Sequence, residues 1–148
     1  MAVTNLAVFA RRMDDRAKSI PKNVHKIVRS VALAADKQIV TITPVDEGTA
    51  KSNWLVSLNV PIESTRSAYS PGKAGSKGEA NIQSAISHAE EVINSSKPGD
   101  DVWIVNNLPY IAALNGSPPH SHQAPSNFVE LSVQAGIEEL KRAKVLED

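Results

Sequence analysis

The sequence predicts an α+β fold, in which a small antiparallel sheet packs against a long N-terminal helix and further helices. Apolar residues recur at helical spacing in several long segments, which hold most of the 148 residues. Apolar and polar residues alternate over 53–60, and a short apolar run covers 102–105. The length suits one domain, so we expect a single domain over 1–148.

The N-terminal segment predicts two consecutive helices. The first, Asn5–Lys18, has a narrow apolar stripe, so it needs a partner surface and forms an N-terminal helical arm over 1–19. Ser19, with Pro21 in the first turn, signals the start of a second helix that ends before Pro44. We expect the sheet to pack on this longer helix, whose inward stripe is Val24, Ile27, Val28, Val31, Ala35 and Ile39.

The central part of the chain predicts a strand, an irregular connection and a helix. The alternation over 53–60 predicts a strand with one buried face. The segment 61–78, rich in Gly, Pro and Ser, predicts an irregular arm, either mobile or holding a second strand over 61–68. Ser76 and Glu79 match a capping box at the start of a helix that ends near Asn94, with His88 outside.

The C-terminal part predicts a strand, a short helix, a stiff loop and a last helix. The run 102–105 predicts an interior strand, and we expect Trp54 and Trp103 in the same sheet with at least one in the core. A short helix over 109–114 leads through a turn into the proline-rich loop 117–124. The last helix runs from Pro125 to Lys144, weakened at Gly136, with Val129, Val133, Ile137 and Leu140 inward.

Composition and charge exclude several classes of protein. The chain has no cysteine, which excludes disulfides and thiolate chemistry and fits a reducing cytosol. Since no apolar run approaches the ~18–20 residues of a membrane span and no secretory signal is visible, we expect a soluble protein. The net charge is zero, with +4 over 1–60 and −4 over 61–148, which argues against a dedicated nucleic-acid binder.

No group of residues predicts catalysis or metal binding. His120 and His122 could share a metal on an extended segment, but the flanking prolines favour a rigid exposed loop. The acid pairs 46–47 and 100–101 lie in turns, where a structural role is commoner than a catalytic one. Known hydrolase, phosphate-loop and metalloprotease motifs are missing from the sequence. We therefore expect no catalytic residue, metal or cofactor.

Two blocks together resemble a known family. Residues 43–60, TPVDEGTAKSNWLVSLNV, hold a Pro-Val-Asp-x-Gly turn followed by Asn-Trp and an alternating strand. Residues 105–133, VNNLPYIAALNGSPPHSHQAPSNFVELSV, hold an Asn-Asn-x-Pro-Tyr entry, an Asn-Gly turn and a Gln-Ala-Pro helix start. The pair resembles the tail-completion proteins of long-tailed double-stranded-DNA bacteriophages. Where that family often has Glu-x-Gly, this chain has Leu114-Asn115-Gly116, so the role of that acid is not carried over.

The resemblance implies a structural virion protein that is assembled in the host cytoplasm and acts at the head–tail neck. Such proteins form rings on the tail tube and help to join it to the filled head, and a hexamer is the natural expectation. The implied partners are further copies of the chain, the tail tube protein, head-completion or neck proteins and, transiently, DNA in the lumen, with no membrane. The candidate interface residues are Leu6, Phe9, Arg12, Tyr69, Lys73, Tyr110, Asn115, Pro118, Pro119, His120 and His122.

Two other functions stay open from the sequence. One is a small metal-dependent or nucleic-acid-processing enzyme that uses the loop with His120 and His122. The other is a DNA-binding module built on the basic residues near the N-terminus, namely Arg11, Arg12, Arg16, Lys18, Lys22 and Lys26.

Overall fold

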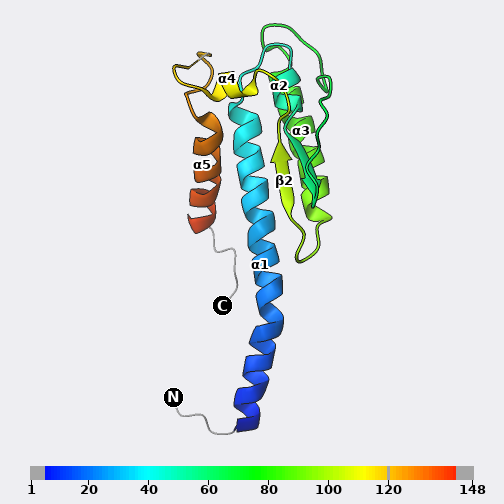
Figure 1. The fold of residues 1–148 in the computed structure, drawn as a ribbon, viewed down its shortest axis with the longest axis vertical. Helices are drawn as coiled ribbons and strands as arrows, with labels where there is room; N and C mark the ends of the chain where they lie inside the picture. Colours follow the sequence, from blue (N-terminus) through cyan, green and yellow to red (C-terminus); the bar gives the residue numbers. More distant parts are fainter. Residues whose placement is uncertain (1–5, 120, 143–148) are drawn as a thin grey trace.

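The chain is organised around one long helix, α1, which runs from Leu6 to Ile42. The computed structural model describes residues 6–119 and 121–142. Figure 1 shows the C-terminal part of α1 among the other elements and its N-terminal part extending beyond them. The fold is α+β, as the sequence predicts, because one two-stranded antiparallel sheet packs with the helices.

The predicted start of a second helix at Ser19 is wrong. The 37 residues of α1 form one helix with Pro21 inside it. A proline in a helix removes one backbone hydrogen bond and costs about 3 kcal/mol. The apolar spacing nevertheless keeps its phase from Ala17 through Ile20 to Val24, so no change of helix direction is needed at the proline. Ser19 therefore lies within the helix and does not mark a helix start.

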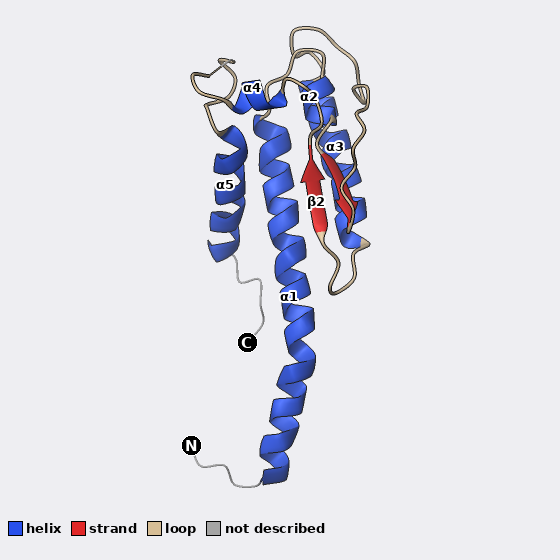
Figure 2. Ribbon diagram, viewed as in Figure 1, coloured by secondary structure: helices blue, strands red, loops and turns tan. Residues whose placement is uncertain are grey.

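The sheet consists of two short strands, β1 (Leu55–Leu58) and β2 (Val102–Val105). They are antiparallel, with Leu55 opposite Val105 and Leu58 opposite Val102. Figure 2 shows the pair, in red, between α1 and α3 (Gly78–Asn94). Within residues 6–119 and 121–142 each strand has only one neighbour, so the prediction of an interior strand at 102–105 is wrong.

The burial of the strand residues also differs from the prediction. Leu55 and Val56 point to opposite faces of the sheet, yet both are buried, so β1 does not have a single buried face. Trp54 directly precedes β1 and is buried, whereas Trp103 in β2 is 41% exposed. At least one tryptophan is therefore in the core, as predicted, and it is Trp54. The prediction that both lie in the sheet is wrong, because β1 begins at Leu55.

The connection between β1 and α3 holds no strand, but hydrogen bonds fix it to the body. Asn53 accepts the Arg66 N–H through Oδ1 at 2.9 Å and donates to the Arg66 carbonyl at 2.8 Å. Asn81 bonds both the N–H and the carbonyl of Ser70, at 2.9 and 2.8 Å. The Tyr69 N–H donates to the Ser52 hydroxyl at 3.1 Å. These contacts join residues 66–70 to the body, whereas the sequence predicts a mobile arm over 61–78.

The start of α3 differs from the predicted capping box. The N-cap residue is Lys77, and no side chain caps the helix there. The Ser76 hydroxyl instead accepts the Lys73 N–H at 3.2 Å, so it stabilises the preceding turn. His88 is exposed on the outer face of α3, as predicted.

The short helix α2 (Thr49–Ser52) begins at a glycine that no other residue can replace without strain. Gly48 has φ 94°, a left-handed conformation that favours glycine. A Cβ atom at Gly48 would also lie 2.2 Å from the amide nitrogen of Asn81. Gly48 thus lets the 44–48 turn pass directly over α3.

The last helix, α5 (Phe128–Arg142), follows the short helix α4 (Ile111–Asn115) and packs along α1. Its buried residues are Phe128, Ser132 and Gly136, whereas the predicted inward residues Val133 and Ile137 are exposed. A Cβ atom on Gly136 would lie 2.9 Å from the Ala35 nitrogen of α1. Beyond Phe128 the inward face consists of the small residues Ser132 and Gly136, because the two backbones approach closely at Gly136.

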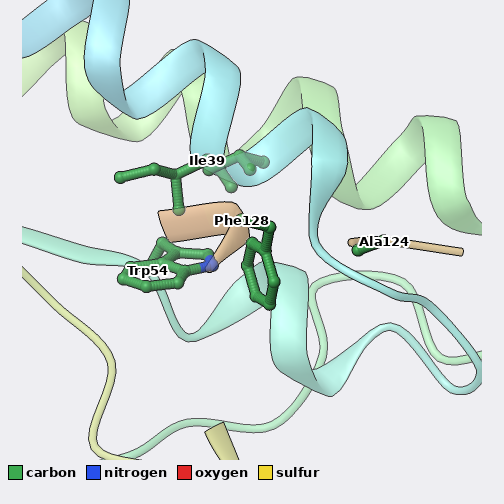
Figure 3. Close-up of a cluster of buried hydrophobic side chains, with 6 residues drawn as sticks. Ile39, Trp54, Ala124 and Phe128 are labelled. Carbon is green, nitrogen blue, oxygen red and sulfur yellow. The ribbon is translucent and has the colours of Figure 1, made fainter. Parts of the chain in front are cut away.

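The core forms where α1, α3, α5 and the residues around β1 meet. One cluster contains Ile39, Val40, Trp54, Ala85, Ala124 and Phe128, and a second contains Ala32, Val56, Ala89 and Ile93. Figure 3 shows Ile39, Trp54 and Phe128 pointing toward one another. Phe128 and Val40 are fully buried, which ties α5 to the C-terminal part of α1.

Candidate assembly surfaces

The two blocks of the sequence resemblance meet at the C-terminal end of α1 and line a pocket of about 360 Å³. We call it the α1-end pocket. The first block contributes residues 44–50, which include the turn and the start of α2. The second block contributes Tyr110, Leu114, Ser121 and Gln123. Segments that are far apart in the chain thus form one concave surface.

A side-chain clamp holds the two blocks together. The Val45 N–H donates to the Gln123 Oε1 at 2.9 Å, and the Gln123 Nε2 donates to the Val45 carbonyl at 3.0 Å. Asn106, from the second block, donates to the Ala50 carbonyl at 3.1 Å. Sequence reasoning missed the role of Gln123, because a glutamine two residues before a proline carries no periodic signal.

The mouth of the α1-end pocket carries acidic groups. Asp46 and Glu47 are exposed, and the Asp46 Oδ1 accepts the Ala74 N–H at 2.8 Å. The pKa of the Tyr110 hydroxyl is raised, first by partial burial and then by the Glu47 carboxylate. The phenol therefore stays neutral and can donate or accept a hydrogen bond with a partner.

Lys51 closes the end of α1 beside this pocket. Its side chain is buried, and Nζ donates to the carbonyls of Val40 and Thr41 at 2.9 and 2.7 Å. These carbonyls belong to the last turn of α1, where no later backbone N–H can reach them. Burial lowers the pKa of Lys51 to about 8, an effect that the Glu79 carboxylate opposes. The ammonium group therefore stabilises the end of α1.

Asn115, a candidate interface residue, holds the start of α5. Its Oδ1 accepts the Val129 N–H at 2.9 Å, and its Nδ2 donates to the Glu130 carboxylate at 3.0 Å. Its main-chain carbonyl accepts the Asn127 N–H at 2.8 Å. The hydrogen bond from Asn115 is the main cause of the lowered pKa of Glu130. Asn115 therefore positions the loop and α5 within the subunit.

The proline-rich loop ahead of α5 presents most of its described side chains to solvent. Pro118, Pro119 and His122 are exposed, while Ser121 lines the α1-end pocket. His120 lies outside the described residues. Within 6–119 and 121–142, no three His, Asp or Glu side chains are grouped closely enough to hold a metal.

Tyr69 and Lys73 lie near the α1-end pocket as well. The Gly72 and Gly75 N–H groups donate to the carbonyls of Glu47 and Asp46, at 3.3 and 2.9 Å, which joins this connection to the pocket's turn. The Arg66 guanidinium stands 3.3 Å from the centre of the Tyr69 ring, a cation–π contact. The Lys73 side chain is exposed. The structure therefore brings these two residues to the same end as Tyr110.

The remaining candidates, Leu6, Phe9 and Arg12, belong to the N-terminal part of α1, at the opposite end of the molecule (Figure 1). Their side chains lie outside the described part. The basic residues Lys22 and Lys26 of the possible DNA-binding face are exposed on α1. Across residues 6–119 and 121–142, no helix is both long and apolar enough to cross a bilayer.

The middle of α1 exposes apolar side chains that the sequence predicts as inward. Ile20 is 59% exposed, Val24 54% and Ile27 40%. The prediction that Val24 and Ile27 face the core is wrong, because within the described residues the buried part of α1 begins at Ala32. We call Ile20, Val24 and Ile27 the α1 stripe.

Comparisons of the chain with known protein families, with curated proteins and with solved structures found no match.

Proposed function

We propose that this protein is a structural subunit of a homo-oligomeric ring at the head–tail neck of a long-tailed bacteriophage, where it caps the tail tube and helps to join the tail to the head. Its partners are further copies of itself, six in a ring by analogy with related necks, together with the tail tube protein and a head-completion protein. The protein acts through its surfaces and not through a catalytic centre.

The observation that carries this proposal is the convergence of the two resemblance blocks at the α1-end pocket. Two segments that resembled the family only by chance would have no reason to lie next to each other in the fold. Here the Gln123 side chain bonds the backbone of Val45, and the blocks share the lining of one surface. Trp54 and Phe128, one from each block, also pack in the same core cluster. The blocks therefore form one structural unit, as a family signature does.

The chemistry of this end suits contact with a protein partner. The α1-end pocket combines apolar side chains with the neutral Tyr110 hydroxyl and the exposed Glu47 carboxylate. Tyrosine is enriched at protein interfaces because its ring supplies apolar area and its hydroxyl a hydrogen bond. The buried polar groups around the pocket, such as Lys51 and Asn81, already have partners within the subunit.

The test is complementation of a phage that lacks this gene. We expect the wild-type protein to restore joined particles, and a Tyr110→Ala, Glu47→Gln double variant to leave filled heads and complete tails apart. Val60→Ser, which changes a side chain that is 70% exposed and outside the pocket lining, is the matched control. Normal joining in the phage without the gene would contradict the neck function. Normal joining with the double variant would contradict the role of the pocket.

A further inference from the structure

A basic groove runs along α1 on the side away from the α1 stripe. Its volume is about 430 Å³, and all of its described lining residues belong to α1. They are Lys22, His25, Lys26, Arg29, Ser30 and Leu33. Intervals of four and three residues place Lys22, Lys26 and Arg29 on one face of the helix, over about 10 Å of its length. Three positive charges therefore share one short surface.

The described part of the chain does not neutralise these charges. Lys22 and Lys26 are exposed, and neither has an ion-pair partner among the side chains that the structure describes. Arg29 donates from Nη2 to the Asn94 Oδ1 at 2.8 Å, so a neutral amide orients the guanidinium without cancelling its charge. A guanidinium has five N–H donors, so this hydrogen bond leaves further donors for an anion.

The acidic side chains near this part of α1 lie outside the basic groove. Asp100 and Asp101 line a separate groove of about 510 Å³, which among the described residues shares only His25 with the basic groove. Glu90 pairs with Lys37 at 3.2 Å, about two turns of α1 beyond Arg29. The surface is thus divided by sign of charge, which the net charge of zero for the whole chain does not reveal.

The composition of the basic groove favours duplex DNA over a protein surface. Protein interfaces are depleted of lysine at their centres and are anchored by aromatic or apolar side chains. Among the described lining residues there is no Tyr, Trp or Phe, and Leu33 is the one large apolar side chain. Single-stranded nucleic acid is bound with aromatic side chains on which the bases stack. Duplex DNA needs only cations that neutralise its phosphates and release counterions.

We propose that the basic groove binds the phosphate backbone of duplex DNA through Lys22, Lys26 and Arg29, without readout of the bases. One chain offers about three phosphate contacts, so its binding is weak and falls steeply with salt. In the ring proposed above, several copies of the groove act on one duplex, and their avidity exceeds the affinity of a single chain. Only the identity of this duplex, as the DNA that passes between head and tail, rests on the proposed function.

The test is the binding of a short fluorescent DNA duplex to the purified full chain, measured by anisotropy over a range of salt concentrations. A Lys22→Gln, Lys26→Gln, Arg29→Gln variant should bind at least about tenfold more weakly at low salt, and the slope of log K against log salt should become shallower by about 3. A Lys77→Gln, Lys141→Gln, Arg142→Gln variant removes the same charge from exposed residues elsewhere and should keep the wild-type slope.

Absence of binding by the wild type at low salt, unchanged binding by the groove variant, or an equal loss in both variants would overturn the proposal. Poly-glutamate is the probe for an acidic protein surface. If it binds more tightly than the duplex, with the same loss in the groove variant, the groove belongs to a protein partner and the DNA proposal fails. Circular dichroism checks the folding of each variant. The complementation assay tests the neck function separately, because DNA binding is measured on the purified chain.

Discussion

At the scale of single residues, buried polar groups fix the path of the chain around the start of β1 and α3. Ser52, Asn53 and Asn81 are fully buried, and each makes hydrogen bonds to backbone or to one another. A buried polar group costs free energy unless it is paired, so these three specify one path for the chain around them. In the part of the chain that the structure describes, Asp36 is the exception, since both its carboxylate oxygens are buried without a hydrogen-bond partner.

Trp54→Ala should lower the free energy of unfolding by roughly 3–5 kcal/mol. The indole fills the main core cluster, and its Nε1 donates to the Thr43 hydroxyl at 2.7 Å. Urea denaturation measures the change. Trp103→Ala is the control, because Trp103 is 41% exposed and should cost much less. Equal effects of the two substitutions would show that the core does not depend on Trp54 in particular.

Asp36 should make the protein less stable as the pH rises from about 4 toward 7. Burial, followed by repulsion from Glu90, raises the pKa of Asp36 from 3.8 to about 7, while Lys37 opposes the shift. The unfolded chain releases the proton near its ordinary pKa and the folded chain near 7, so unfolding is favoured progressively between these values. Each pH unit of the difference is worth about 1.4 kcal/mol.

The Asp36→Asn variant measures this effect, since asparagine has nearly the same shape and does not titrate. We expect the free energy of unfolding of the wild type to fall relative to the variant by several kcal/mol between pH 4.5 and 7, with the two curves parallel above that range. The comparison uses only the difference in pH dependence between the two proteins, because burying the asparagine side chain itself changes the free energy of unfolding. Parallel curves throughout would mean that Asp36 ionises normally in the folded protein.

At the scale of elements, the packing of α5 on α1 depends on small residues. The Gly136→Ala variant tests this, because helix propensity and packing predict changes in stability of opposite sign. Helix propensity alone predicts that alanine stabilises α5 by up to ~1 kcal/mol. The structure predicts destabilisation instead, because the new Cβ would lie 2.9 Å from the Ala35 backbone nitrogen. Thermal unfolding should show a lower midpoint for the variant. Gln134→Ala, on the exposed side of α5, should change it little.

The connection between β1 and α3 should be protected in hydrogen exchange, although it has no regular structure. The N–H groups of Arg66, Tyr69, Ser70 and Gly75 donate to groups of the body. Asn81→Ala removes the partner of Ser70 and should speed exchange around it. Thr65, for which no such bond is formed within the described residues, serves as the reference for rapid exchange. Rapid exchange of all four N–H groups in the wild type would support the mobile-arm hypothesis.

At the scale of the whole molecule, the N-terminal part of α1 extends beyond the body. Figure 1 shows that part of the helix running clear of the other elements. Deletion of residues 1–18 should therefore leave the urea midpoint of the body nearly unchanged and weaken self-association. Sedimentation and urea denaturation of the shortened chain measure the two effects. A large loss of body stability would show that the segment supports the core.

The sequence by itself determined α3, α4, α5, both strands and the α+β class, because these depend on apolar spacing within short segments. It divided α1 into two helices and missed α2. It also marked the two blocks that meet at the α1-end pocket. The tertiary structure alone decided which face of each helix is covered. Val133 and Ile137 of α5 are exposed because Gly136 allows a closer contact between backbones, and Val24 is exposed because Gly136 of α5 meets α1 further along, at Ala34 and Ala35. Periodicity shows that a helix has an apolar face, but only the neighbouring elements determine whether that face is buried.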